Sequence, residues 1–158
     1  MSETDELTQK LTSQRQELLA ALGQLDDQKA GQRPADGEWC AKEQLVHLVQ
    51  MEQRWLGWAL QVRDNPGSTV GSTTGNPEGF PDAMTSSLSD LLSQLAGTRQ
   101  DTLNTIRGLS EEELGRKGRH TEFGEMSVLQ MLRAPYRHDR MHMEQIQGKE
   151  VSFKPRQG

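Results

Sequence analysis

Four histidines, His47, His120, His138 and His142, are the side chains of this chain best suited to bind a transition metal. The last two lie four residues apart in the segment RHDRMHMEQI. On a helix, this spacing places both imidazoles on one face, about 6 Å apart along the axis, a separation that two ligands of one metal can close. The pair therefore predicts two metal ligands on one helix.

His47 lies in another amphipathic segment, and the rise of a helix tests whether it can join the pair. It is about six residues from the predicted start of its helix, a depth of roughly 9 Å. His142 and His138 lie roughly 8 and 14 Å from the predicted end of theirs. These depths agree only if the two helices are antiparallel. Three neutral imidazoles with an open fourth position are then typical of a site that polarises a bound water or thiol.

Simpler interpretations of the same histidines stay open at this point. A histidine pair at i and i+4 on a polar helix is often a solvated face. His47 lies between Val46 and Leu48, which is compatible with a hydrogen-bonded histidine of the core. His120 lies in a Gly-rich segment, which favours a role in a loop or at a helix start.

Other motifs in the chain carry weaker signals. The segment HDRMH resembles the H-E-x-x-H motif of zinc proteases, but Asp139 is one methylene shorter than the usual glutamate base. A di-iron site of the ferritin type needs two Glu-x-x-His pairs, and only Asp139-x-x-His142 comes near, so we do not expect one. Glu43 either caps a helix at Cys40 or orients His47 from four residues away. Cys40 is either a small buried residue or a thiol activated at a helix N-terminus.

Length and composition bound the function classes. The 158 residues are enough for one domain, so we expect a single unit over residues 1–158. The net charge of −5 disfavours nucleic acid and anionic membranes as partners. A single cysteine excludes an intrachain disulfide and favours a reducing compartment. The chain has neither a signal peptide nor an apolar span, so we expect a cytoplasmic protein.

Leucine-rich periodicity predicts an all-α fold. Apolar residues recur at helical spacing over Thr4–Leu25, Ala41–Arg63 and Asp82–Arg107, and again from Ser127 to Gly148. Four such segments indicate a four-helix bundle. Pro135 lies inside the last segment, where it removes a backbone hydrogen bond and predicts a kink or a break into two pieces.

The connections between these helices differ in length. Asp26–Gly37 is polar, which predicts an ordinary connection between two helices. Asp64–Pro81 is rich in Gly and Pro and predicts a long loop, of the kind used as a crossover or an active-site flap. Gly115–Glu125 is also expected to be a loop.

Two segments, EWCAKEQLVHLVQMEQRW and FGEMSVLQMLRAPYRHDRMHMEQI, resemble the DinB-like superfamily. That family carries a Trp-Ser step before a helix with His-Leu-x-x-x-Glu, a Gly-Glu-x-Ser/Thr start to the last helix, and a His-x-x-x-His pair near its end. The resemblance implies an up-down-down-up bundle whose ligands for zinc, nickel or iron are His47, His138 and His142. Cys40 departs from the usual Ser, and Pro135 lies one turn before His138.

The residues and the resemblance together predict a metal-dependent enzyme. The metal would activate a low-molecular-weight thiol or water, as in thiol S-transferases, and a small-molecule substrate would enter beneath Asp64–Pro81. The alternatives are a non-catalytic stress or damage-inducible module with a structural metal, and a helical interaction protein without a metal. A homodimer is also expected from the resemblance. The sequence does not identify the metal, because imidazole suits several.

Overall fold

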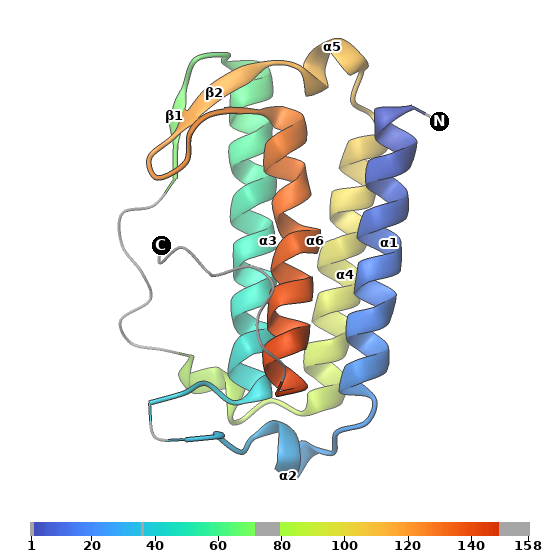
Figure 1. Cartoon of the computed structure of the whole chain (residues 1–158), viewed down its shortest axis with the longest axis vertical. Coiled ribbons are helices and arrows are strands. Elements are labelled where there is room, and N and C mark those ends of the chain that lie inside the picture. Colours follow the sequence, from blue (N-terminus) through green and yellow to red (C-terminus); the bar gives the residue numbers. More distant parts are fainter. Residues whose placement is uncertain (1, 36, 72–79, 149–158) are drawn as a thin grey trace.

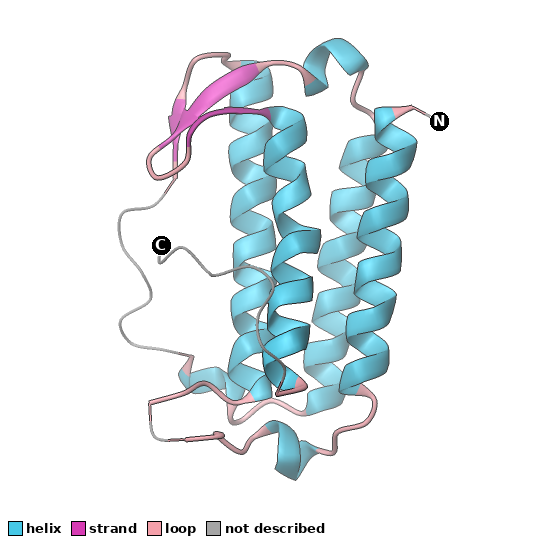
Figure 2. Ribbon diagram, in the orientation of Figure 1, coloured by secondary structure: helices cyan, strands magenta, loops and turns pink. Residues whose placement is uncertain are grey.

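The computed structural model describes residues 2–35, 37–71 and 80–148. Four long helices dominate it (Figures 1 and 2): α1 (Glu3–Leu22), α3 (Ala41–Asp64), α4 (Leu88–Arg107) and α6 (Val128–Ile146). Helices α1 and α6 run one way along the bundle, and α3 and α4 run the other way. The predicted up-down-down-up four-helix bundle is therefore confirmed, and α3 is antiparallel to α6.

Short elements close the two ends of the bundle. These are α2 (Asp27–Ala30), a 3₁₀ turn (Pro81–Ala83), α5 (Glu111–Leu114), and three strands, β1 (Thr69–Val70), β2 (Lys117–His120) and β3 (Gly124–Ser127). No helix among the described residues is long and apolar enough to cross a bilayer.

Local sequence explains where most helices begin. Ser2, Ser87 and Ser127 accept hydrogen bonds from backbone N–H groups in the first turns of α1, α4 and α6. At the start of α3, the Glu43 carboxylate instead accepts from the backbone N–H of Cys40 at 3.1 Å. Helix α4 begins at Leu88 and not at Asp82, because Ser87 provides its N-cap; Met84, within the range expected to be helical, precedes the helix and is 47% exposed.

Two other sequence-based expectations need correction. Helix α6 is one continuous helix through the buried Pro135, so the predicted break is absent. Gly115–Glu125, expected to be a loop, contains β2 and the start of β3, which pair as an antiparallel hairpin. Gly118 allows β2 to approach α3, because a Cβ there would lie 2.5 Å from a Val62 methyl. Tertiary packing thus overrides the weak strand propensity of this segment.

The loop predicted over Asp64–Pro81 is only partly described. Its Thr69–Val70 step forms β1, which pairs in parallel with β2. Residues 72–79 lie outside the described residues, as does the substrate entry route that was assigned to them.

The bundle interior consists of two apolar layers separated by polar side chains. The layer nearer the sheet contains Leu11, Trp55, Ile106 and Leu132, and the layer nearer α2 contains Leu18, Leu45, Leu48 and Leu91. Four charged residues lie between the layers, one from each long helix: Arg15, Glu52, Arg99 and Asp139. The histidines of interest lie beside this polar level.

Candidate metal centre

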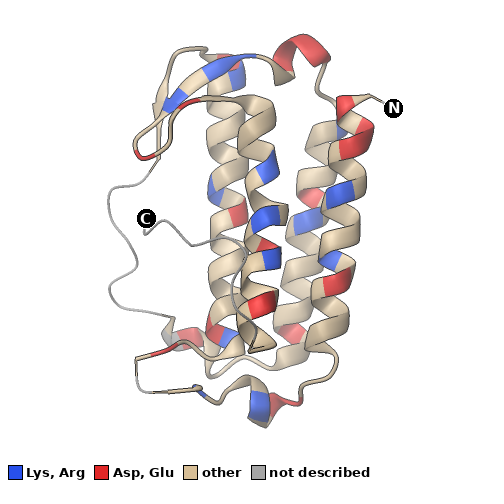
Figure 3. Ribbon diagram, viewed as in Figure 1, with Lys and Arg blue, Asp and Glu red and all other residues tan. Residues whose placement is uncertain are grey.

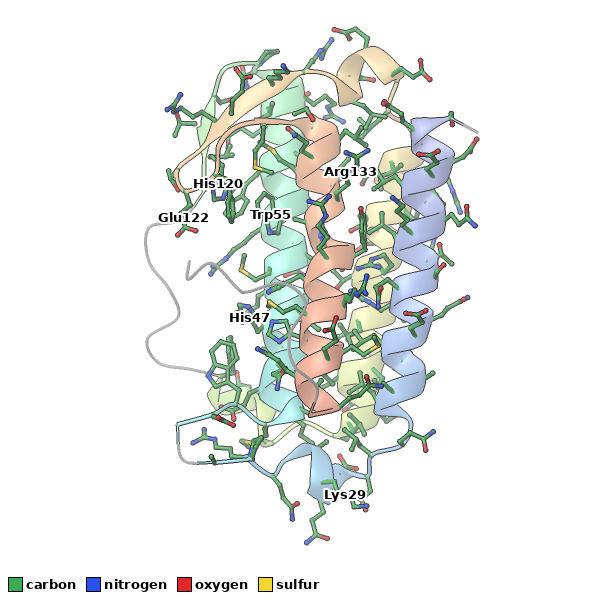
Figure 4. All side chains as sticks on the ribbon, in the orientation of Figure 1. Lys29, His47, Trp55, His120, Glu122 and Arg133 are labelled. Carbon is green, nitrogen blue, oxygen red and sulfur yellow. The ribbon has the colours of Figure 1, made fainter. Side chains whose placement is uncertain are left out.

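The fold brings His47 of α3 together with His138 and His142 of α6. One ring nitrogen from each of the three lies within 4.8 Å of the others. The ring centroids are 4.9 Å apart for His47 and His138, 5.2 Å for His47 and His142, and 4.6 Å for the α6 pair. The antiparallel course of the two helices places the α3 histidine at the depth of the pair, as the helix-rise argument requires. In Figure 4, His47 projects from α3 on the side that faces away from α1.

The donor set fits a divalent transition metal. The Nε2 atoms of His138 and His142 are 3.1 Å apart. Two nitrogens bound to one tetrahedral zinc at a bond length of about 2.0–2.1 Å lie about 3.3 Å apart, so the pair needs only a small adjustment. Three histidines are the protein ligand set of some catalytic zinc sites, whereas structural zinc sites use four protein ligands.

Burial keeps all three imidazoles in the neutral form that binds metals. Burial, with a smaller effect from the Arg54 charge, lowers the pKa of His47 to about 4. Burial and the neighbouring His47 lower the pKa of His138 to about 3, against the opposing charge of Glu52. Burial and the other two histidines lower the pKa of His142 well below its usual value. Protons therefore compete little with a metal at neutral pH.

Gln44, which sequence reasoning missed, orients one ligand. Its Oε1 lies 2.9 Å from His142 Nδ1, and its Nε2 donates to the Trp39 carbonyl at 3.5 Å. Because the amide nitrogen faces a carbonyl, the amide oxygen accepts the Nδ1–H of His142. The Nε2 of His142 is then left with a free lone pair directed at the cluster. No sequence motif marks a glutamine in this role.

Two aromatic rings cover one side of His47. The centroids of Trp39 and Phe80 lie 5.0 and 5.9 Å from the His47 ring, and 5.0 Å from each other. Trp39 is 36% exposed, whereas Phe80 is buried. This wall limits the access of water to His47 and offers an apolar contact to a small molecule.

The structure decides between the two roles suggested for Glu43 and between the two suggested for Cys40. Glu43 caps α3 and forms a two-pronged ion pair with Arg33, with both contacts at 2.9 Å, so its carboxylate is occupied away from His47. The Cys40 side chain is fully buried, and burial raises the pKa of its thiol. The capping and buried-residue interpretations therefore hold.

Asp139 belongs to a second polar cluster, which the sequence did not reveal. Arg15 binds both oxygens of Asp139 at 2.8 and 2.9 Å, and Glu52 at 2.7 Å. Arg99 binds Glu52 at 2.8 and 3.0 Å and Asp139 at 2.9 Å, and the Thr102 hydroxyl donates to Glu52 at 2.7 Å. We call these four charged residues the ion network. Asp139 is committed to it, so the comparison with the protease motif fails.

His120 does not join the metal cluster. It is the last residue of β2, not a loop or helix-start residue, and its ring is stacked on Trp55, with centroids 5.1 Å apart. Trp55 lies eight residues from His47 on α3, which is about 12 Å along the helix. Figure 4 shows His120 and Trp55 near the sheet and His47 farther down α3.

Comparisons with known proteins identify the family and the fold. The family model described as the DinB superfamily matches residues 10–146. Among solved structures, YfiT from Bacillus subtilis, described as a probable metal-dependent hydrolase with an unusual four-helix bundle topology, superposes with a TM-score of 0.78. It is 16% identical, and the match covers 94% of this chain and 87% of that chain.

Two further structures share the fold. The four-helix bundle protein TT2238 has a TM-score of 0.68 and 22% identity over 92% of this chain and 99% of its own. A mycothiol-dependent maleylpyruvate isomerase has a TM-score of 0.68 and 12% identity over 89% of this chain and 59% of its own. A search of curated proteins finds no match. At these identities the structural similarities establish the fold alone.

Proposed function

Because the chain belongs to the DinB superfamily, we propose that it is a metal-dependent enzyme that activates a low-molecular-weight thiol or water. The observation that carries the proposal is the convergence of three neutral imidazoles, with their ring nitrogens within 4.8 Å of one another. The descriptions of two relatives, a probable metal-dependent hydrolase and a mycothiol-dependent isomerase, are consistent with water and thiol as the alternative nucleophiles.

Each residue of the site has a defined task in this proposal. His47, His138 and His142 hold a divalent metal, for which zinc, nickel and iron are all compatible with imidazole. Gln44 fixes the ring orientation of His142. Trp39 and Phe80 exclude water on the His47 side and contact the apolar part of a substrate. When bound, the metal lowers the pKa of a coordinated thiol or water and so supplies a nucleophile at neutral pH.

Metal content followed by activity tests this proposal. Protein purified without chelator and without a nickel column is expected to contain close to one metal per chain by elemental analysis. Thiol transfer to 1-chloro-2,4-dinitrobenzene and hydrolysis of 4-nitrophenyl acetate are then measured before and after chelation. We expect one of these activities to disappear on chelation and to return with the metal.

A matched pair of histidine variants separates the site from the rest of the chain. His142→Ala removes one ligand, and His120→Phe changes a histidine outside the cluster. Metal binding and turnover are expected to be lost only in the first variant. Full activity in His142→Ala would overturn the proposal, and a metal that stabilises the fold without any turnover would favour the non-catalytic alternative.

A further inference from the structure

The helices that carry the histidines contain both signs of charge (Figure 3), and their carboxylates are all neutralised. The acidic residues of α3 and α6 each pair with arginine. The pairs are Glu43 with Arg33, Glu52 and Asp139 with Arg15 and Arg99, Asp64 with Arg63, and Glu144 with Arg140. None of these carboxylates is left to attract a cationic ligand or to neutralise a further cation.

Arg54 of α3 carries a positive charge and belongs to none of these ion pairs. It is exposed, and within the part of the chain that the structure describes no carboxylate lies within 4.0 Å of its guanidinium. Its Nη1 lies 3.9 Å from the sulfur of Met51, so the side chain extends back toward the start of α3. Met51 is four residues from His47, about 6 Å along the axis. The guanidinium therefore lies about one helical turn from the histidine cluster.

The guanidinium of Arg54 is close enough to the cluster for its charge to act there, because it lies beside Met51, about one helical turn from His47. Three neutral imidazoles add no negative charge to a divalent metal, so the loaded site would be strongly positive and Arg54 would extend that field along α3. A ligand that fits such a site carries negative charge at two points.

We propose that Arg54 makes the site selective for anionic substrates, specifically a small thiol whose carboxylate lies two or three carbons from the sulfur. The inference rests on the proposed function: the histidine-bound metal takes the sulfur, and Arg54 takes the carboxylate. Guanidinium suits this task because its planar fork donates two parallel hydrogen bonds to a carboxylate. The one-turn spacing between His47 and Met51 matches a ligand of this length.

Binding to cobalt-loaded protein tests the selectivity without any activity assay. Three thiols of similar size serve as probes: 3-mercaptopropionate, 2-mercaptoethanol and cysteamine. Sulfur binding is followed by the thiolate-to-cobalt charge-transfer absorption in the near ultraviolet. We expect 3-mercaptopropionate to bind tightest in the unmodified protein. Arg54→Gln is expected to weaken it by roughly tenfold while changing 2-mercaptoethanol by less than about twofold.

Charge reversal and a remote control sharpen the result. Arg54→Glu is expected to reverse the order, so that cysteamine binds better than 3-mercaptopropionate. Arg107→Gln removes the same charge from the exposed end of α4, at the opposite end of the bundle, and is expected to leave all three affinities unchanged. Equal losses in Arg54→Gln and Arg107→Gln would mean that only net charge matters, and would overturn the proposal.

A dicarboxylate distinguishes failure of this inference from failure of the thiol activity. Succinate and acetate are titrated against the visible absorption of the same cobalt-loaded protein, and Arg54→Gln is expected to weaken succinate alone. If no thiol gives the charge-transfer band but succinate keeps its dependence on Arg54, the thiol function fails and the anion selectivity stands. If thiols bind and Arg54→Gln changes neither 3-mercaptopropionate nor succinate, the selectivity fails alone. Protein that binds no cobalt overturns both.

Discussion

Two polar clusters lie next to each other in the bundle, and they differ in how their groups are satisfied. In the ion network, two arginines and two carboxylates neutralise one another, and the interaction is complete within the protein. In the histidine cluster, three groups of the same kind face one another, and the Nε2 atoms of His138 and His142 approach to 3.1 Å. The first cluster is satisfied by groups of the protein itself, whereas the second has the donor set of a metal site.

The chain places the two clusters next to each other in sequence. His138 and Asp139 are consecutive residues of α6, and they point about 100° apart around the helix, so one faces the histidines and the other the arginines. Asp139 fixes the rotation of α6 through its bonds to Arg15 and Arg99. The ion network therefore also sets the direction in which the α6 histidines point.

Breaking the ion network is expected to have the largest effect. Arg99→Met leaves Glu52 and Asp139 buried with one arginine between them, and removal of one partner from a buried pair costs about 3–5 kcal/mol. The free energy of unfolding, measured by urea denaturation, is expected to fall by that amount.

A double variant checks that the loss comes from the unpaired charge. Arg99→Met combined with Glu52→Leu removes one positive and one negative group and leaves the two-pronged Arg15–Asp139 pair intact. We expect the double variant to be more stable than Arg99→Met alone. If the two losses simply add, the network does not act as a unit.

Metal addition is expected to affect only the histidine cluster. With zinc at about one hundred times its dissociation constant, the free energy of unfolding of the wild-type protein should rise by about 2.7 kcal/mol. The increment should disappear in His142→Ala, because the remaining two imidazoles bind weakly. Thermal unfolding of chelated and zinc-loaded protein measures the difference.

Gln44→Ala provides an intermediate case for the same measurement. Loss of a group that orients a metal-bound histidine typically lowers the affinity for the metal by 10- to 100-fold. The zinc increment should therefore shrink without vanishing. An unchanged increment would show that Gln44 does not set the orientation of His142.

The pH dependence of metal-free protein also separates the clusters. The folded-state pKa values of His47 and His138, about 4 and about 3, lie below the value of about 6.5 in the unfolded chain. Below pH 6.5 the unfolded state thus binds more protons than the folded state. The free energy of unfolding is therefore highest above that pH and falls as the pH approaches 4. Each such histidine lowers the free energy of unfolding at pH 5 by about 2 kcal/mol relative to neutral pH.

His138→Gln tests this assignment. The variant has one fewer histidine to protonate on unfolding, so its stability between pH 7.5 and pH 5 should fall by about 2 kcal/mol less than that of the wild-type protein. Urea denaturation at the two pH values, in the presence of chelator, gives the comparison. Equal losses in both proteins would show that His138 is not kept neutral by burial.

Features that depend on helical spacing could be predicted from the sequence. Leucine periodicity identifies the long helices, and a depth calculation from helix rise groups His47 with His138 and His142. These features depend on residues close together along the chain, or on the regular geometry of one helix. Of the kink or break predicted at Pro135, the break does not occur, because tertiary packing holds the helix around this buried residue.

Features that depend on pairing between distant segments could not be predicted. Arg15, Glu52 and Arg99 look like surface charges in an amphipathic helix, and only the bundle shows that they face inward. Gln44 contacts His142 across 98 residues. The β2–β3 hairpin has few strand-forming residues, so its formation depends on contacts with α3.

His120 is a buried polar residue outside both clusters, and its substitution is expected to have the smallest effect. Its Nδ1 accepts from the backbone N–H groups of Glu122 and Phe123 at 3.0 and 3.3 Å, so the proton lies on Nε2. That buried Nε2–H has no hydrogen-bond partner in the described structure. His120→Phe keeps an aromatic ring beside Trp55 and removes the unsatisfied donor, while the two N–H groups that lose their acceptor belong to exposed residues of the turn between β2 and β3. We therefore expect the free energy of unfolding to rise by about 1 kcal/mol, with the zinc increment unchanged. A clear loss of stability would show that the Nδ1 bonds matter more than the unpaired donor, and would place His120 with the ion network as a group that stabilises the fold.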